Sequence, residues 1–280
     1  MATIYSPAEK GFDERLSLID KAQIALLREV MSELGAGRLI LKGGMAMRAV
    51  IGSMRLTKDI DFDRDPKLTL NAVKGRLRKS LEAAASNAGI RSPKAEITKE
   101  TPTTVRARLS GRSATGGDLR FEVEVSGRQI ELNRRYIRAV SVIPPASYAM
   151  APFLVEAYTG DMLAAMKIAA AMSDLRNAPR DVYDLYDLIG IGADPVPLLA
   201  TQPLALLQEV RRTAMSKIEH IGFALAREEL LPYLPRADRK QLTEDRWTDY
   251  ILVVGEAIER WADAGLALQA AEPPTPEASA

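Results

Sequence analysis

The chain has 280 residues, of which 47% are hydrophobic and 27% are charged, and its formal net charge is +1. These values are ordinary for a globular protein with a buried core. The absence of cysteine excludes disulfides, cysteine metal sites and cysteine nucleophiles.

Two features predict a cytoplasmic protein without a membrane span. The N-terminus has no apolar signal-peptide run. The most apolar stretch, Met162–Met172, is too short to cross a bilayer and contains Lys167.

Charge is distributed unevenly along the chain. Residues 64–138 contain seventeen Lys and Arg against eight Asp and Glu, a net of +9, whereas residues 139–280 have a net of −8. A basic segment favours contact with an anion such as a triphosphate or RNA. The alternative is a solvated charged surface.

Helices and strands alternate in the N-terminal third. Apolar residues recur at helical spacing in its longer segments, and period-two alternation marks the second strand. The predicted elements are a helix over 12–34, a strand over 38–41, a helix over 45–50, a strand over 56–63 and a helix over 69–88 closed by Gly89.

The rest of the chain changes character at Pro144-Pro145. Before it, residues 95–143 alternate with period two and are punctuated by glycine, which predicts an antiparallel extension of the sheet. After it, the pattern predicts helices over 154–175, 180–189, 198–229 in pieces and 240–270. We therefore predict an α+β fold with a mixed-sheet lobe over 1–145, a helical lobe over 146–270, a disordered tail over 271–280, and a site in the cleft between the lobes.

Asp59-Ile60-Asp61 is the central candidate for chemistry. Side chains at i and i+2 of a strand share one face, so both carboxylates can converge on a divalent cation, while Ile60 and Phe62 point into the core. Mg²⁺ prefers such oxygen ligands and keeps positions open for substrate phosphates. Asp63 lies on the same face and can replace or assist either aspartate. The alternative is a solvent-facing edge strand.

Lys42-Gly43-Gly44 lies between a predicted strand and a predicted helix. Glycines allow backbone N–H groups to approach a phosphate closely, and Lys42 adds positive charge. Most Gly-Gly pairs are simple turns, but this one precedes the acidic strand at short range.

Glu122-Val123-Glu124 supplies a further pair of carboxylates on one strand face. Either glutamate can serve as the third acid of a two-metal site. The alternative is cross-strand pairing with Arg106 or Arg108.

The helical half offers Lys167, Asp181 and Asp184. Lys167 either extends to solvent or points into the site and binds phosphate. Asp181 follows Pro179 in the first turn of a helix, where a carboxylate is favoured without any function. His220 is the only histidine and lacks a nucleophile motif, and no Walker A loop or Rossmann fingerprint is present.

Together these motifs resemble the AbiEii/AbiGii toxin family, nucleotidyltransferases similar to DNA polymerase β. The resembling segments span 42–188 and are Lys42-Gly-Gly-Met-Ala-Met47, Arg55-Leu-Thr-Lys-Asp-Ile-Asp-Phe62, Phe121-Glu-Val-Glu-Val-Ser126, Ala165-Met-Lys167 and Arg180-Asp-Val-Tyr-Asp-Leu185. One departure is Met45, where the family usually has threonine and related enzymes serine, so a hydroxyl contact to phosphate is lost.

The resemblance implies a nucleotidyltransferase-type fold and a role for each motif. Asp59 and Asp61 would bind Mg²⁺, with Glu124 as the third acid or the base. Lys42, Gly43 and Gly44 would cradle the phosphates of an NTP. Lys167 would stabilise charge on the triphosphate, and Asp181, with Asp184 as backup, would orient the acceptor or Lys167.

The resemblance also implies a toxin that transfers NMP to RNA or tRNA and is paired with a cognate antitoxin, a winged-helix regulator. One alternative is a nucleotidyltransferase of small molecules, such as an antibiotic-modifying enzyme, which the acidic C-terminal half favours. The other is a non-catalytic nucleotide-binding module, which Met45 favours.

Overall fold

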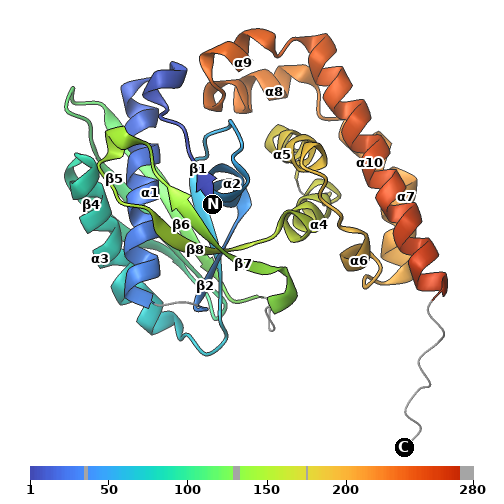
Figure 1. Cartoon of the computed structure of the whole chain (residues 1–280), viewed down its shortest axis with the longest axis horizontal. Helices are drawn as coiled ribbons and strands as arrows, with labels where there is room; N and C mark the ends of the chain where they lie inside the picture. Colours follow the sequence, from blue (N-terminus) through green and yellow to red (C-terminus); the bar gives the residue numbers. More distant parts are fainter. Residues whose placement is uncertain (35–36, 129–132, 175, 272–280) are drawn as a thin grey trace, which may run out of the picture. The chain divides into compact units, whose positions relative to one another are not determined.

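A computed structural model describes residues 1–34, 37–128, 133–174 and 176–271, which form two compact units (Figure 1). The first contains the chain up to Thr159 together with Tyr233–Lys240, and the second contains Gly160–Pro232 and the chain from Gln241 onward. The predicted disordered tail lies, from Glu272 on, outside the described residues.

The first unit is built on one mixed sheet. Its eight described strands lie in the order β1-β7-β8-β2-β3-β6-β5-β4. At the centre, β3 runs antiparallel to β2 and parallel to β6, and β4, β5 and β6 form the predicted antiparallel extension. The strands are β1 (Ala2–Thr3), β2 (Leu39–Lys42), β3 (Asp59–Arg64), β4 (Arg91–Glu100), β5 (Thr104–Arg112), β6 (Asp118–Ser126), β7 (Ile137–Ile143) and β8 (Phe153–Tyr158).

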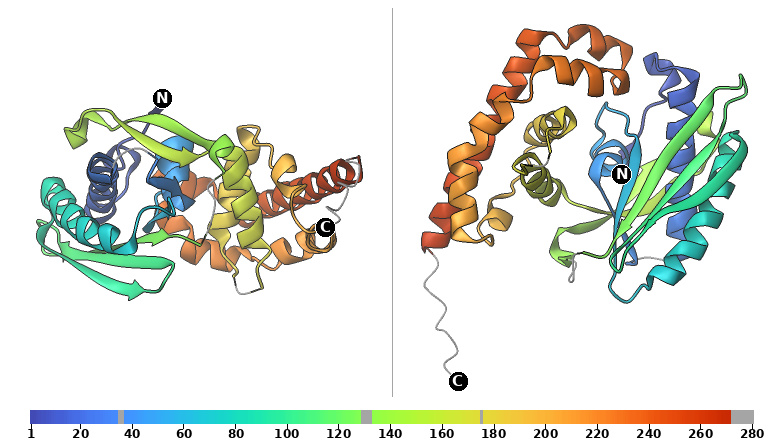
Figure 2. Two further views of the ribbon diagram at one scale, coloured as in Figure 1. Left: turned by 90° about the horizontal axis from the view of Figure 1, so that it is seen from below. Right: turned by 180° about the vertical axis from the view of Figure 1, so that it is seen from behind.

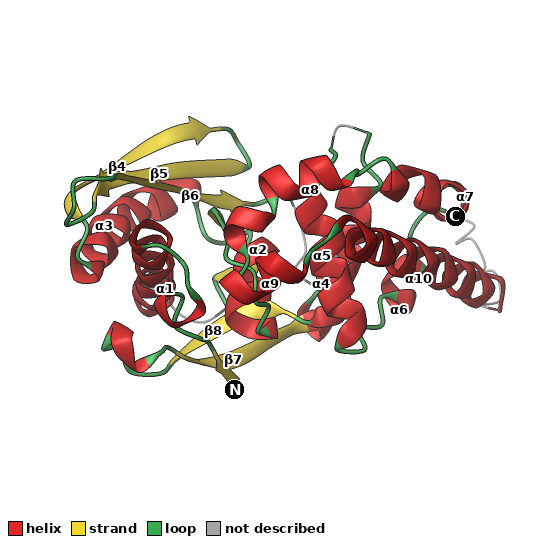
Figure 3. Cartoon of the chain, turned by 90° about the horizontal axis from the view of Figure 1, so that it is seen from above, coloured by secondary structure: helices red, strands yellow, loops and turns green. Residues whose placement is uncertain are grey.

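Two long helices, α1 (Glu14–Leu34) and α3 (Leu70–Ala88), pack against each other and against this sheet. Figure 3 shows both on the same side of β4, β5 and β6. The hydroxyl of Thr69 caps α3 by accepting the N–H of Ala72, and Gly89 ends it with a φ of 91°. Both predicted helices are therefore confirmed.

The segment 153–158 corrects the prediction of a helix beginning at 154. It forms β8, which pairs antiparallel with β7 and parallel with β2. Val155, Ala157 and Tyr158 are buried in the sheet. Pairing with the preceding strand β7 and with the distant strand β2 overrides the local helical pattern here. The predicted boundary at Pro144-Pro145 falls before this strand.

The second unit, which begins at Gly160, is helical, whereas the sequence predicted a helical lobe from residue 146. Trp247 anchors its core by donating its indole N–H to the carbonyl of Ile221 at 2.7 Å. Figure 2 shows α7 in orange beside α10 in red. The helices of this unit are α4 (Gly160–Ala171), α5 (Pro179–Gly190), α6 (Val196–Leu199), α7 (Leu204–Glu219), α8 (Phe223–Glu229) and α10 (Glu244–Ala271). Of the described helices, none has the length and apolar character needed to span a bilayer.

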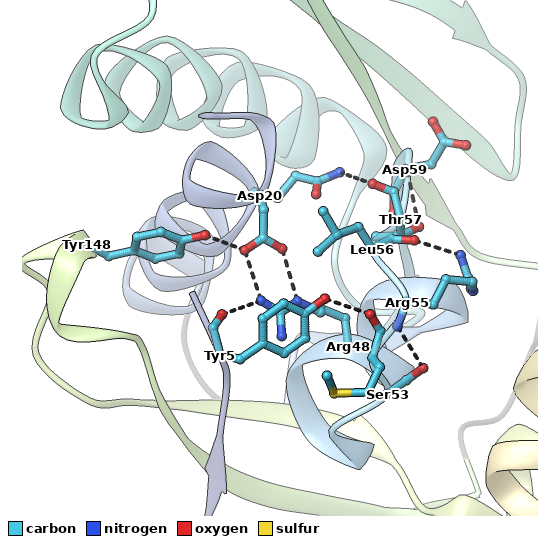
Figure 4. A network of polar contacts seen from close by, with 11 residues as sticks. Tyr5, Asp20, Arg48, Ser53, Arg55, Leu56, Thr57, Asp59 and Tyr148 are labelled. Atoms are coloured by element: carbon cyan, nitrogen blue, oxygen red, sulfur yellow. Dashed lines mark hydrogen bonds and ion pairs between the residues drawn. The ribbon is translucent and has the colours of Figure 1, made fainter. Parts of the chain in front are cut away.

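A buried ion pair that the sequence patterns did not indicate joins the N-terminal elements of the first unit (Figure 4). Arg48, which is 0% exposed, donates from Nε and one terminal nitrogen to the carboxylate of Asp20, each at 3.1 Å. The same guanidinium donates to the carbonyl of Tyr5 and lies 3.8 Å from that ring's centre, while the Tyr148 hydroxyl donates to Asp20 at 2.5 Å. Arg48 thus fixes the helical turn that follows Gly43-Gly44 against α1.

Candidate active site

The strand β3 has the alternation predicted from its sequence. Ile60 and Phe62 are fully buried, whereas Asp59 and Asp61 are only half-buried on the opposite face. In the parallel register with β6, Asp59 lies beside Glu122, and Asp61 lies beside Glu124. Adjacent strands are separated by about 4.8 Å, so the four carboxyl groups project from one small area of the sheet.

The Gly43-Gly44 turn packs directly against this acidic face. Gly43 has a φ of 64°, and a Cβ added there would lie 2.6 Å from Oδ2 of Asp61. A Cβ on Gly44 would lie 2.6 Å from the hydroxyl oxygen of Thr57. Glycine is therefore required at both positions, because a side chain would collide with Asp61 or Thr57. The turn lies beside Asp61, as the motif predicts. The turn opens α2 (Gly43–Ala46), which continues into a π-helical turn, Met47–Ile51.

Gly43→Ala is expected to lower nucleotidyl transfer by about a hundredfold, because the methyl group displaces the Asp61 carboxylate by a fraction of an ångström or more. The left-handed backbone adds a stability cost of about 1 kcal/mol. The matched control is Gly89→Ala, which has the same type of backbone at φ 91° but no atom within 4 Å of the added Cβ. Steady-state kinetics and thermal unfolding of both variants check this. Equal activity in the two variants would show that Gly43 does not position Asp61.

Met45 stands where the resembling family has a hydroxyl residue, and it is fully buried. Its side chain packs into the core behind the turn. The substitution removes a hydroxyl and leaves the backbone of Gly43 and Gly44 on the acidic face.

Lys42 and Asp63 form a pair of their own beside the turn. The ammonium of Lys42 lies 2.5 Å from Oδ1 of Asp63, and the Tyr158 hydroxyl donates to Oδ2 at 3.0 Å. Burial and the Asp63 charge raise the pKa of Tyr158 well above its usual range, so the hydroxyl stays a donor. Because Asp63 is only 3% exposed, it is poorly placed to replace Asp59 or Asp61. The phosphate role of Lys42 stays a prediction.

Glu122 and Glu124 pair with arginines of β5, as the alternative interpretation of these acids predicts. Arg106 donates to Oε2 of Glu124 at 2.7 and 3.1 Å, and Arg108 donates to Oε1 of Glu122 at 2.8 and 3.0 Å. Burial raises the pKa of Glu122, but hydrogen bonding and charge from Arg108 outweigh it, so the pKa lies below its ordinary value. The role of Glu124 as a third acid stays a prediction.

The donor set fits Mg²⁺ at the aspartates. Hard carboxylate oxygens from one or two residues, completed by water and substrate phosphates, are the usual protein contribution to a Mg²⁺ site. Asp59 and Asp61 supply such a pair. Among the residues that the structure describes, no group of three or more acidic or histidine side chains has a metal-binding arrangement.

The segment before β3 is held on several sides (Figure 4). The Tyr5 hydroxyl donates to the carbonyl of Met54 at 2.6 Å, and the amide of Gln23 donates to the carbonyl of Thr57 at 3.4 Å. The Thr57 hydroxyl in turn donates to the carbonyl of Asp59 at 3.1 Å. The position of the first aspartate thus depends on contacts with α1 and the N-terminal segment.

A cavity of about 360 Å³ opens beside Asp59 within the first unit. Its lining includes Leu16 of α1, Phe121 of β6 and Tyr233, which belongs to the short segment that returns to this unit. Sequence patterns did not indicate Tyr233, since it is separated from Asp59 by more than half the chain.

In the second unit, Lys167 is buried, which rules out its extension into solvent. Its ammonium lies 2.8 Å from Asp181 and 2.5 Å from Asp184, and Arg176 lies 2.7 Å from the other oxygen of Asp181. Burial raises the pKa of Asp181, but the charges of Lys167 and Arg176 together outweigh it, so the pKa lies below its usual range. The predicted residues Lys167, Asp181 and Asp184 are thus brought together in one charged cluster.

Solved structures share the fold at low sequence identity. MenT4, a nucleotidyltransferase toxin from Mycobacterium tuberculosis H37Rv, superposes with a TM-score of 0.56 at 17% identity over 94% of this chain and 96% of that one. JHP933 from Helicobacter pylori gives 0.57 at 15% identity, covering 93% and 97%. A putative nucleotidyltransferase from H. pylori gives 0.58 at 15% identity, covering 90% and 98%. These matches confirm the predicted α+β nucleotidyltransferase fold.

Comparison by sequence supplies the family. No curated protein matches the chain. The sequence model of the nucleotidyl transferase AbiEii toxin family, of type IV toxin–antitoxin systems, matches residues 25–264 and confirms the family resemblance. The chain therefore belongs to the AbiEii family of nucleotidyltransferase toxins.

Proposed function

We propose that this nucleotidyltransferase transfers a nucleoside monophosphate from a magnesium-bound NTP to a hydroxyl of an RNA acceptor, with tRNA as the first candidate. The observation that carries the proposal is the packing of Gly43 against Asp61 on the acidic face of β3. A close backbone turn beside two carboxylates is the combination that holds phosphates and their cation together.

Each site residue has a distinct task in this proposal. Asp59 and Asp61 hold Mg²⁺, which, when bound, neutralises charge on the transferring phosphate. The glycine backbone and Lys42 orient the triphosphate, so that catalysis rests on positioning and electrostatics. Glu124 takes the proton of the acceptor hydroxyl or completes the acid set once Arg106 releases it.

On the family resemblance alone, we assign Lys167 of the second unit to the charge that develops on the triphosphate. Asp181 and Asp184 hold its ammonium in place by ion pairs at 2.8 and 2.5 Å, and Arg176 pairs with the second carboxylate oxygen of Asp181. The two carboxylates offset the cost of burying the Lys167 side chain, because a buried charge without a partner is strongly unfavourable.

The acceptor is assigned as RNA because cations gather on the strands next to the acidic face. Arg106, Arg108 and Arg120 project from β5 and β6 with between about a third and three-fifths of their side chains exposed. Glu122 and Glu124 offset these arginines locally, but residues 64–138 as a whole carry a net charge of +9, which favours a polynucleotide over a cationic aminoglycoside. The antitoxin implied by the family is proposed to be a winged-helix regulator encoded beside the toxin gene.

The direct test incubates the purified protein with each α-³²P-labelled NTP, MgCl₂ and either total RNA, purified tRNA or aminoglycosides. We expect label from one or two of the NTPs on RNA, and none when EDTA replaces MgCl₂. Labelling of the aminoglycoside alone would favour the antibiotic-modifying alternative. Label on neither acceptor, with any divalent metal, would favour a non-catalytic module.

A further inference from the structure

The cavity beside Asp59 is lined by three kinds of side chain. One part is apolar and aromatic, formed by Leu16 and Ile19 of α1, Phe121 of β6 and the ring of Tyr233. Another is cationic, formed by Lys58 and Arg120 together with Arg15, and the third is acidic, formed by Asp59 and Glu122, of which Glu122 pairs with Arg120 at 3.5 Å. All of these residues lie in the first unit.

Tyr233 is held in place at this cavity. Its carbonyl accepts the N–H of Leu56 at 2.8 Å, and the ammonium of Lys58 lies 5.0 Å from its ring centre. The segment Tyr233–Lys240 is also fixed at its far end, where Arg239 donates to the carbonyl of Gly11 at 3.1 Å and lies over the ring of Phe12. The chain thus returns from the helical unit and fixes one aromatic ring beside the first aspartate.

The size and chemistry of the cavity fit one nucleotide unit. Its volume, about 360 Å³, lies within the range of small-molecule sites. An aromatic ring opposite apolar side chains can stack a base of any identity. Cations at the rim can contact the phosphates on either side of that base.

The position of the cavity distinguishes the acceptor from the incoming NTP. Gly43 follows β2 and touches Asp61, whereas the cavity adjoins Asp59 and Glu122 toward β6. The two meet at Thr57, which lines the cavity and lies 2.6 Å from the position of a Cβ on Gly44. In-line transfer places the attacking and leaving oxygens on opposite sides of the phosphorus. We therefore propose that this cavity binds the nucleotide of the acceptor RNA that carries the attacking hydroxyl, with Tyr233 stacking its base and Arg120 contacting a neighbouring phosphate. This rests on the function proposed above.

The first test measures RNA binding in the absence of NTP. A mixed-sequence pool of 12-nucleotide RNAs with 5′-fluorescein and free 3′ ends is titrated with protein, and anisotropy is recorded. Tyr233→Ala is expected to weaken binding at least about fivefold, and Tyr233→Phe to preserve it, since stacking needs only the ring. Arg120→Ala is expected to weaken binding about threefold. It should also make the plot of log affinity against log salt concentration less steep, by about the amount that one phosphate contact contributes.

The matched control is Arg78→Ala, because Arg78 is a similarly exposed cation on α3 that pairs with Glu82 at 3.8 Å and does not line the cavity. Its RNA affinity should match that of the wild type. Truncating the Tyr233 side chain leaves the Leu56 hydrogen bond intact, because that bond uses the main chain. Should Tyr233→Ala nevertheless unfold, Arg120→Ala carries the test alone.

The second test is steady-state transfer with the same variants. We expect KM for RNA to rise at least about fivefold in Tyr233→Ala, while KM for NTP stays unchanged. A rise in KM for NTP alone would assign the cavity to the incoming base and overturn the inference. Unaltered RNA affinity in both cavity variants, or no RNA binding by the wild type, would overturn it as well. RNA binding that depends on Tyr233 without any transfer would instead refute the proposed function and retain the cavity as an RNA site.

Discussion

Asp61→Asn is expected to lower the rate of nucleotidyl transfer at least about a thousandfold, the rate equivalent of about 4 kcal/mol of lost charge stabilisation. Asparagine keeps the shape of the side chain but is a poor ligand for Mg²⁺. The free energy of unfolding should change by about 1 kcal/mol or less, because the substitution is isosteric, half-buried, and removes repulsion from the neighbouring Glu124. Single-turnover assays at saturating NTP and urea denaturation check the two expectations.

The control for this variant is Asp118→Asn at the start of β6, whose carboxylate is 92% exposed. It carries the same chemical change on the same sheet, and we expect full activity. A large loss of stability in Asp61→Asn, with activity lost only in proportion to the unfolded fraction, would show that this acid is structural.

Arg48→Met is expected to lower the free energy of unfolding by about 3–5 kcal/mol, because it leaves the carboxylate of Asp20 buried without its cation. Burial lowers the pKa of Arg48, but Asp20 outweighs it, so the guanidinium stays charged in the folded protein. Urea denaturation at neutral pH measures the loss. Arg28→Met is the matched control on α1, since Arg28 pairs with Glu29 at a partly exposed position and should cost less than about 1 kcal/mol.

The double variant Asp20→Leu with Arg48→Met separates charge from packing. Removing both charges should restore part of the stability lost in Arg48→Met, because a well-packed apolar pair can replace a buried ion pair. A cost below about 1 kcal/mol in Arg48→Met alone would contradict the view that this pair fixes the turn after Gly43-Gly44.

Features that depend on neighbouring residues in the chain could be predicted from sequence. The alternation of Asp59, Ile60, Asp61 and Phe62 determines which side chains face the core, because a strand has a period of two. Gly43 and Gly44 indicated a turn whose backbone can approach a phosphate closely. The helices α1, α3 and α5 could be predicted from the spacing of their apolar residues and from the residues at their ends.

Features that depend on distant residues could not be predicted in the same way. The segment 153–158 has a helical pattern locally but becomes β8 through pairing with β2 and β7. Asp20, the partner of Arg48, is 28 residues away in the sequence. Whether Glu124 faces a metal ion or pairs with Arg106 depends on the register of β5 and β6. The cavity requires the return of Tyr233 to the first unit, which nothing near that residue in the sequence indicates.

The most direct test of the central claim is anomalous diffraction from crystals grown with Mn²⁺ and a non-hydrolysable NTP analogue. The account predicts a metal peak about 2.1 Å from carboxylate oxygens of both Asp59 and Asp61, with the triphosphate lying along the backbone of Gly43 and Gly44. A bound metal and triphosphate remote from the two aspartates would contradict it.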